Sequence, residues 1–158
     1  MKKVIALICL VCLSVCVFAA CGDDAPASLA GKTYVLDDVA IKVSDSMSAE
    51  EQKTMKDSLV AMNADYANMT LNEIINDMMK STIDSLKETN AKFVFKEDGV
   101  VESSAAGEET TTGSYENKDG KWFITLDGDT REVTLSGKAM YISEETDGLL
   151  VVMKMVQQ

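Results

Sequence analysis

The spacing of apolar positions changes from two to a helical period and back along the chain. Residues 30–43 alternate in steps of two, which predicts a strand. The acidic pair Asp37 and Asp38 interrupts the alternation and predicts a bulge or turn, after which the apolar face continues. The positions expected on this face are Tyr34, Leu36, Val39, Ile41 and Val43.

Two helical stretches follow. Ser48-Ala49-Glu50-Glu51 and Thr70-Leu71-Asn72-Glu73 have the spacing of a capping box, so each predicts a helix start. The first stripe consists of Met55, Leu59, Met62, Tyr66 and Met69, and the second of Leu71, Ile74, Ile75, Met78, Ile83 and Leu86. The phase changes between the two stripes, which predicts two helices with a break near residues 68–70. One long kinked helix is the alternative.

Short alternating runs separated by turn signals fill the rest of the chain. Asp-Gly occurs at 98–99, 119–120, 127–128 and 147–148, and Ser-Gly at 136–137. Asp-Gly between alternating runs is a strong hairpin signal, because both central residues of a type I′ turn need positive φ. The expected strands are 92–97, 100–104, 110–117, 121–126, 130–136, 138–144 and 149–156, joined as an antiparallel meander.

The last expected strand is apolar on both faces apart from Lys154, so we expect it to be buried on two sides. The helices would cover the outward side of this strand, with their Met and Leu stripes packed on the outside of the curled sheet. Their Met-rich face is therefore interpreted as core rather than as a binding groove.

The first twenty residues have the pattern of a secretory signal. Lys2 and Lys3 precede an apolar run that closes on the small residues Ala19 and Ala20. A membrane-spanning helix is the competing interpretation, but 17 residues is the lower limit for a span and the following flank is acidic. Cys9 and Cys12 form a C-x-x-C pair inside this segment, so they would be discarded with it.

Residues 17–21, Val-Phe-Ala-Ala-Cys, resemble a bacterial lipobox, although Phe18 stands where Leu is more common. The resemblance implies that Cys21 carries a diacylglyceryl group and becomes the first mature residue, anchored to a membrane by two or more acyl chains. Residues 22–28 would form a tether spanning at most ~28 Å. The same signal serves bacteria with one membrane or two, so the outer face of the plasma membrane and the outer membrane both stay open.

Charge excludes one class of partner. Removal of residues 1–20 takes away two Lys and no acid, leaving 13 basic and 26 acidic residues and a formal charge of −13. Binding to nucleic acid requires neutralisation of phosphates, so we expect none. The acidic surface also disfavours adhesion of the domain itself to an anionic bilayer.

Several turn and strand motifs resemble the lipocalin-like, calycin-type domains of bacterial envelope lipoproteins. They are Phe93-Val94-Phe95-Lys96-Glu97-Asp98-Gly99, Gly113-Ser114-Tyr115, Asp119-Gly120-Lys121-Trp122, Leu135-Ser136-Gly137 and the opening run Leu29-Ala30-Gly31-Lys32-Thr33-Tyr34. The resemblance covers most of the mature chain and implies an α+β fold with a barrel or half-barrel, for which the common proposal in similar proteins is binding of a small apolar ligand. Tyr34 and Tyr115 depart from the family, which often has Trp there.

The sequence lacks the side chains and motifs that commonly carry out catalysis. The chain has no His, the mature chain would have no free Cys, and no S-x-x-K motif is present, so we expect no enzyme, no cofactor and no metal. The side chains expected to point into the curl of the sheet are Tyr34, Phe93, Phe95, Tyr115, Trp122 and Ile124. They either contact a small apolar ligand or fill an ordinary core.

The domain organisation expected is a signal peptide at 1–20, a lipidated Cys and tether at 21–29, and a lipocalin-like domain at 30–158 with a helical insert at about 48–89. The expected function is a non-enzymatic, membrane-anchored binding module of the cell envelope. A protein-interaction module that uses its acidic surface over a filled core is the alternative.

Overall fold

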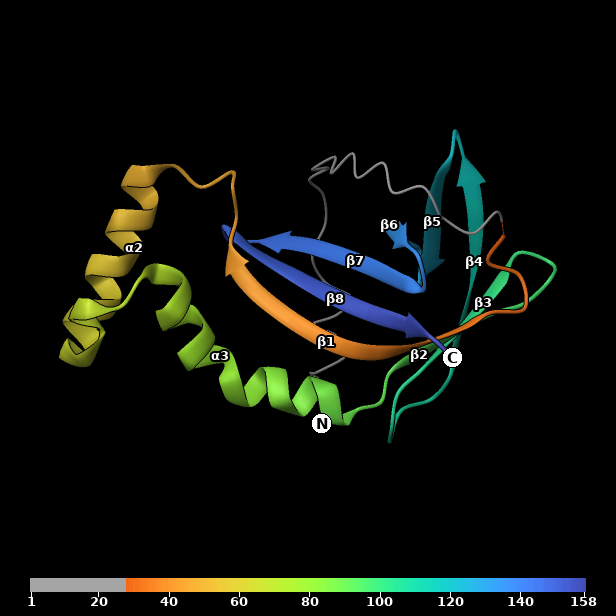
Figure 1. Cartoon of the computed structure of the whole chain (residues 1–158), viewed down its shortest axis with the longest axis horizontal. Coiled ribbons are helices and arrows are strands. Elements are labelled where there is room, and N and C mark those ends of the chain that lie inside the picture. Colours follow the sequence, from red (N-terminus) through yellow and green to blue (C-terminus); the bar gives the residue numbers. More distant parts are fainter. Residues whose placement is uncertain (1–27) are drawn as a thin grey trace.

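The structure is a computed structural model that describes residues 28–158, and its centre is a closed antiparallel β-barrel. Each strand pairs with the next along the chain and the last strand pairs with the first, which confirms the meander (Figure 1). The strands are β1 Thr33–Val43, β2 Lys92–Phe95, β3 Val100–Ser104, β4 Thr111–Lys118, β5 Lys121–Leu126, β6 Asp129–Ser136, β7 Ala139–Thr146 and β8 Leu149–Gln157. Every predicted strand is present, with ends that differ by one or two residues except in β1, which starts three residues later.

The hairpin turns follow the local chemistry of their residues. In the turns at 119–120, 127–128 and 147–148, both the Asp and the Gly have positive φ, as a type I′ turn requires. At 98–99 and 136–137 only the glycine does. The Asp-Gly pairs therefore mark real hairpins, and three of the four have the backbone that their sequence predicts.

A β-bulge in β1 keeps its apolar residues on one face. Leu36 pairs with Met155 and Asp38 with Lys154, so Asp37 is the extra residue. Without this insertion the positions after Asp38 would change face, because side chains alternate along a strand. Val39 and its apolar neighbours instead continue the inward face that begins at Tyr34, as predicted.

The helices α2 Ala49–Met62 and α3 Leu71–Glu88 lie between β1 and β2 in the chain. Both predicted capping boxes are formed, with Glu51 and Glu73 accepting from the backbone N–H of Ser48 and Thr70 at 2.8 and 2.6 Å. Each such cap stabilises a helix by about 1 kcal/mol.

The first helix ends earlier than its apolar stripe predicts. Asn63 adopts an extended conformation after Met62, and its side chain accepts a hydrogen bond from the N–H of Asp65. That bond starts a separate 3-10 helix, η1 Ala64–Asn68, so Tyr66 leaves the α-helical stripe. The break therefore extends from residue 63 to residue 70, and the single long helix is excluded.

Three strands continue beyond the closed barrel. The β1–β2 pairing is limited to Thr33–Val35, whereas β1 pairs with β8 as far as Val43. On the other side, β6 and β7 pair only up to Val133 and Ile142, although β7 continues beside β8. Strands β7, β8 and β1 thus form an extension at one end of the barrel (Figure 1).

Helix α3 packs on the inner face of this extension, not on the outside of the sheet as expected. Its buried residues Leu71, Ile75 and Ile83 cluster with Val39 and Ile41, which share a face with Tyr34. The bulge keeps the apolar residues of β1 on the inward face, and the separation of β6 from β7 leaves this face open beyond the barrel, where α3 covers it.

This arrangement also corrects the expectation for β8. On its outward face only Leu150 is buried, while Val152 and Val156 are half-buried, because no helix covers that side. Leu29 requires a correction as well: it is fully buried in the barrel core rather than part of the tether, so the fold includes Leu29.

Candidate functional site

The six side chains expected inside the curl do gather in one cluster. Tyr34, Phe95, Tyr115 and Ile124 are buried, and Phe93 and Trp122 are half-buried against them. They come from four strands, and alternation brings them to the same face of the sheet. The structure therefore places them together, while their contact with a ligand stays a prediction.

The rings of this cluster contact one another closely. Phe95 lies edge-on to Tyr34 and to Tyr115, with ring centroids 5.8 and 5.0 Å apart and interplanar angles of 85°. Tyr115 is in turn 6.0 Å from Trp122. Edge-to-face pairs at such distances are favourable, and an eight-stranded barrel is just wide enough for its own side chains. The aromatic side chains thus pack against one another as a core.

The two tyrosine hydroxyls of this core differ in their hydrogen bonds. Tyr115 donates to the carbonyl oxygen of Lys96 at 2.5 Å, whereas the buried hydroxyl of Tyr34 has no partner in the described part of the chain. Burial raises the pKa of both hydroxyls above its usual value. Tyr34 is therefore neutral at physiological pH and leaves one unpaired polar atom inside the barrel.

A polar pair also points inward where β6 and β7 separate. Arg131 is two residues before buried Val133, and Glu144 two residues after buried Ile142, so both lie on the inward face. Their side chains approach to 3.2 Å with 22% and 13% exposure. Burial raises the pKa of Glu144, the charge of Arg131 opposes this shift, and Asp129 adds to it. The ion pair connects the two strands beyond their last backbone pairing.

Sequence reasoning missed this pair, although a signal was present. Continuing the two-residue period of the apolar face backward along β6 and forward along β7 reaches Arg131 and Glu144. A charged residue at an apolar position, matched by an opposite charge on the neighbouring strand, predicts an inward ion pair.

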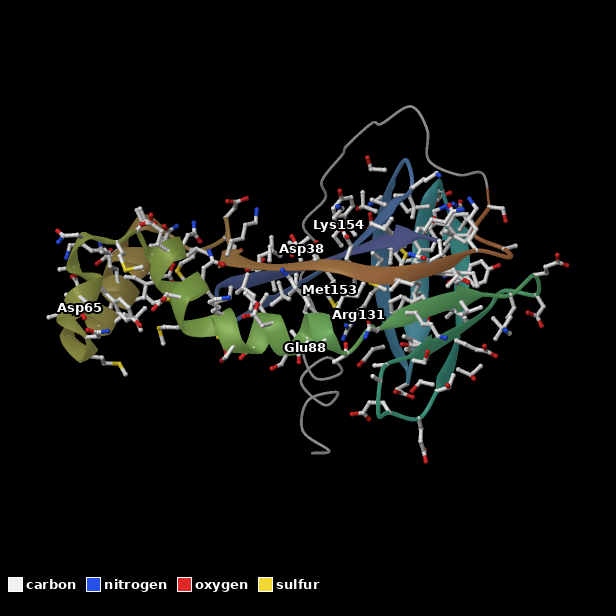
Figure 2. All side chains as sticks on the ribbon, turned by 60° about the horizontal axis from the view of Figure 1, so that its bottom comes forward. Asp38, Asp65, Glu88, Arg131, Met153 and Lys154 are labelled. Atoms are coloured by element: carbon white, nitrogen blue, oxygen red, sulfur yellow. The ribbon has the colours of Figure 1, made fainter. Side chains whose placement is uncertain are left out.

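The large apolar side chains that are exposed in residues 28–158 lie on the two helices. None of the α2 side chains is buried. Met62 is 79% exposed and Met78 on α3 is 47% exposed, so the interpretation of the Met-rich face as core is wrong for these two. It holds in part for Met55 and Met79, which are half-buried against the core cluster. Both views place α2 and η1, which carries Asp65, farthest from the barrel (Figure 1; Figure 2). We call residues 49–70 the helical arm.

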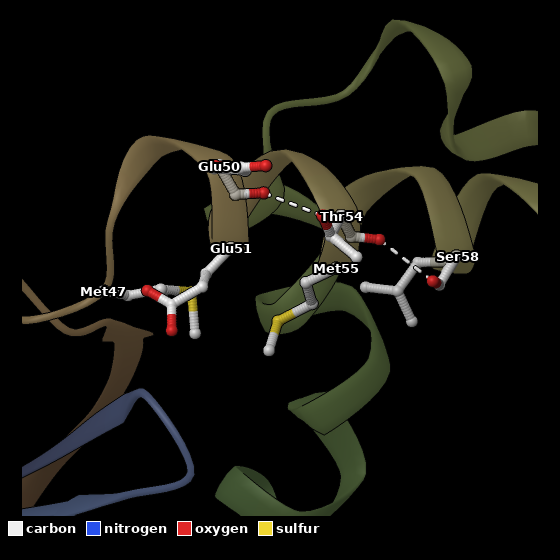
Figure 3. Close-up of a pocket in the computed structure, with 7 residues that line it drawn as sticks. Met47, Glu50, Glu51, Thr54, Met55 and Ser58 are labelled. Carbon is white, nitrogen blue, oxygen red and sulfur yellow. Dashed lines mark hydrogen bonds between the residues drawn. The ribbon is translucent and has the colours of Figure 1, made fainter.

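An open groove lies along one side of the arm. Met47, Met55 and Leu59 form its apolar part and are half-buried against the core cluster of α3 and β1. Figure 3 shows the Met55 side chain extending from α2 toward α3, with Met47 in the loop before α2. The remaining lining residues are Glu50, Glu51, Thr54 and Ser58. Every charged residue that lines the groove is therefore acidic.

The cap of α2 fixes one of these acids. Glu51 accepts hydrogen bonds from the hydroxyl and the backbone N–H of Ser48, which lower the pKa of Glu51. Beside Met47, the hydroxyl of Ser46 donates to Glu145 of β7, and this bond lowers the pKa of Glu145. Both carboxylates are thus charged at neutral pH; Glu51 lines the groove, and Glu145 is bonded to the residue that precedes Met47.

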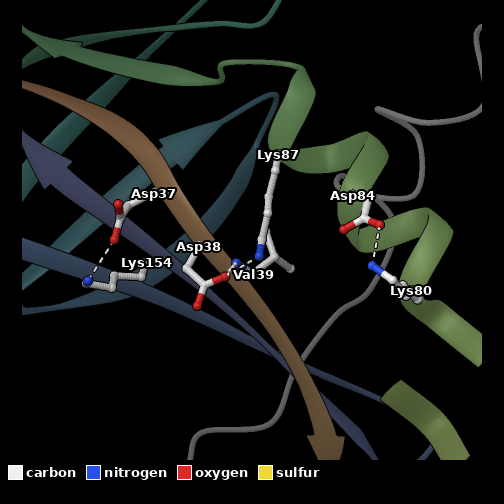
Figure 4. Close-up of polar contacts among 7 residues, drawn as sticks. All are labelled: Asp37, Asp38, Val39, Lys80, Asp84, Lys87 and Lys154. Carbon is white, nitrogen blue, oxygen red and sulfur yellow. Dashed lines mark hydrogen bonds and ion pairs between the residues drawn. The ribbon is translucent and has the colours of Figure 1, made fainter. Parts of the chain in front are cut away.

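Polar contacts fasten α3, and through it the arm, to the barrel. Lys87 forms an ion pair of 2.6 Å with Asp38, next to the bulge, and lowers the pKa of that carboxyl (Figure 4). On the other side of the bulge, Lys154 contacts Asp37 at 2.7 Å. At the opposite end of α3, the Asn72 side chain accepts from the N–H of Val43 at 2.7 Å. The ends of α3 are held, whereas α2 has no ion pair to the barrel within residues 28–158.

Two searches of the described residues gave negative findings. No helix within residues 28–158 is long and apolar enough to cross a membrane. No group of three or more His, Cys, Asp or Glu side chains in that range could hold a metal ion.

Comparisons of the chain with protein-family models, with curated proteins and with solved structures found no match.

Proposed function

We propose that this chain is a lipid-anchored protein of the bacterial envelope that acts, without catalysis, by binding a protein partner through its helical arm. The observation that carries the proposal is the contrast between a barrel interior occupied by its own side chains and an arm whose Met62 is 79% exposed. Beside it, the groove adds a contiguous apolar lining of Met47, Met55 and Leu59 with acidic and hydroxyl side chains around it. Exposed apolar patches rimmed by polar residues mark interaction sites.

In this proposal the barrel is a lipocalin-like scaffold. The closed eight-stranded meander supports that assignment, as do the turn motifs that the chain shares with such domains. Ring contacts from Phe93 through Phe95 and Tyr115 to Trp122 rigidify the scaffold. A rigid barrel can present a lightly attached arm at a fixed distance from an anchor.

The position of the arm fits an anchor at Cys21. The described chain enters β1 at the end that holds Tyr34, with Leu29 just before the strand, whereas the arm follows the other end. Eleven residues of β1 separate these ends by about 36 Å. Lipid on Cys21 would therefore hold the opposite end of the molecule close to the membrane and leave the arm accessible.

Intact-mass spectrometry tests the anchor. We expect protein extracted in detergent from its own cells to have the mass of residues 21–158 plus a diacylglyceryl group, because the lipobox pattern directs lipid to the Cys21 sulfur. The Cys21→Ser variant should lose the lipid mass. An unmodified residue 21 in the wild-type protein, or the same added mass in the variant, would contradict lipid anchoring.

Photo-cross-linking in intact cells tests partner binding. A benzophenone amino acid at Met62 is expected to give a discrete adduct of higher mass, because this exposed side chain lies on the arm. The matched control is the same amino acid at Thr112, an exposed position on β4 of the barrel. If Met62 gives no adduct, or Thr112 gives the same one, the arm is not the binding site.

A second candidate function is binding of a small apolar ligand inside the barrel. The specific observation in its favour is the buried Tyr34 hydroxyl without a partner, since unpaired buried polar groups are uncommon and a ligand can satisfy them. The six inward residues from Tyr34 to Ile124 would then line the site. The close ring contacts favour the first candidate.

A further inference from the structure

We propose that the groove of the helical arm docks a basic amphipathic helix of the partner protein. This inference rests on the proposed function and specifies the chemistry of the partner. The groove combines an apolar part, formed by Met47, Met55 and Leu59, with charged lining residues that are all acidic. A helix with apolar residues on one face and Lys or Arg beside them complements both features.

The shape of the groove favours a helix over an extended peptide. Glu51, Met55 and Leu59 follow one another at steps of four along α2, so they form a ridge of a single helix face. A second helix packs against such a ridge with its own residues at steps of three and four. Methionine suits this role because its flexible side chain adapts to the partner's surface.

The charges near the groove favour a basic partner over a second copy of this chain. Glu50 and Glu51 line the groove, and Glu145 accepts a hydrogen bond from Ser46, the residue before Met47 of the groove. Lys53 on α2 is already paired with Asp57. Two copies meeting here would bring like charges together, on mature chains that each carry a formal charge of −13.

The experiment measures peptide binding by fluorescence anisotropy. The full chain is placed in nanodiscs of zwitterionic lipid, and the signal of empty nanodiscs is subtracted. The probe is a labelled 18-residue amphipathic helix of Leu and Lys, and a Leu and Glu helix of the same pattern is the negative control. We expect saturable binding of the Leu/Lys helix alone, weakened by added salt because charge contributes to it.

Variants distinguish docking in the groove from general attraction to an acidic protein. Met55→Lys combined with Leu59→Lys is expected to weaken binding at least 10-fold, because both the apolar contact and the charge complement are lost. Thr110→Lys combined with Thr112→Lys adds the same charge at exposed barrel positions and should change affinity less than 3-fold. Glu50→Lys, an exposed single change, should weaken binding about 3-fold or more without affecting the fold.

Four outcomes would overturn the inference. These are no binding of the Leu/Lys helix, equal binding of the Leu/Glu helix, equal weakening by the two double variants, and a dimer in sedimentation that the groove variants dissociate. If photo-cross-linking places a partner on the arm but the Leu/Lys helix does not bind, the proposed function stands and the partner chemistry is wrong. If both experiments fail, the proposed function fails with the inference.

Discussion

Replacement of Phe95 by Ala is expected to lower the free energy of unfolding by about 3–5 kcal/mol. Phe95 is 1% exposed and contacts three other rings, those of Phe93, Tyr34 and Tyr115, within 6.5 Å. Truncation removes these contacts and leaves a cavity that the surrounding strands cannot close, because they are fixed by barrel pairing on both sides. Urea denaturation followed by Trp122 fluorescence measures the loss.

Phe123→Ala is the matched control for this prediction. Phe123 is on β5 next to buried Ile124, so it points to the opposite face of the sheet and is only half-buried. We expect its truncation to cost about 1 kcal/mol, since little buried area is lost. Equal effects of the two substitutions, or a loss below about 1 kcal/mol for Phe95→Ala, would show that the interior is not closely packed. That result would favour the ligand-binding candidate.

Features specified by neighbouring residues could be predicted from the sequence. The turns at Asp119 and Asp127, the capping boxes at Ser48 and Thr70, and the bulge at Asp37 are each determined by short segments. Their local chemistry decides the backbone irrespective of the rest of the fold. The closed meander follows from them, because short hairpins leave each strand beside the next.

The placement of the helices could not be predicted in the same way. An amphipathic stripe shows that a helix covers something, but both faces of a curled sheet offer apolar residues here. The face that α3 covers is decided by the separation of β6 from β7, which exposes the inward residues Val39 and Ile41 beyond the barrel. This separation depends on the length of pairing between strands, which the hydrophobic pattern does not specify.

The candidate site was recognised only in part for a related reason. Tyr34 and the other inward residues follow from alternation, so the sequence identified them. The exposed surface of the arm could not be identified from the sequence. A stripe of methionines at helical spacing is ordinarily core, and Met55, Leu59 and Met62 have that spacing. Met55 and Leu59 are partly covered, because they pack against the core cluster of α3 and β1, whereas Met62, at the early end of α2 before Asn63, is exposed.

Gly113→Ala is expected to destabilise the barrel by about 3 kcal/mol or more, or to prevent folding. A Cβ atom at Gly113 would lie 2.0 Å from the carbonyl oxygen of Thr125 and 2.8 Å from Cδ2 of Leu126. The first of these contacts is with backbone, which cannot rotate away as a side chain can. Strand β5 would have to move from β4 at the point where the two strands pair, and the closed barrel transmits that shift to its neighbours.

The adjacent Ser114 provides the comparison for Gly113. Ser114 lies on the same strand, is exposed and also pairs with Thr125. Ser114→Ala only removes a hydroxyl from an exposed side chain, so it should change the free energy of unfolding by less than about 0.5 kcal/mol. Circular dichroism and urea denaturation of both variants measure the difference. A Gly113→Ala protein as stable as Ser114→Ala would mean that β4 and β5 are farther apart than described, and that the barrel at this point has room for more than its own side chains.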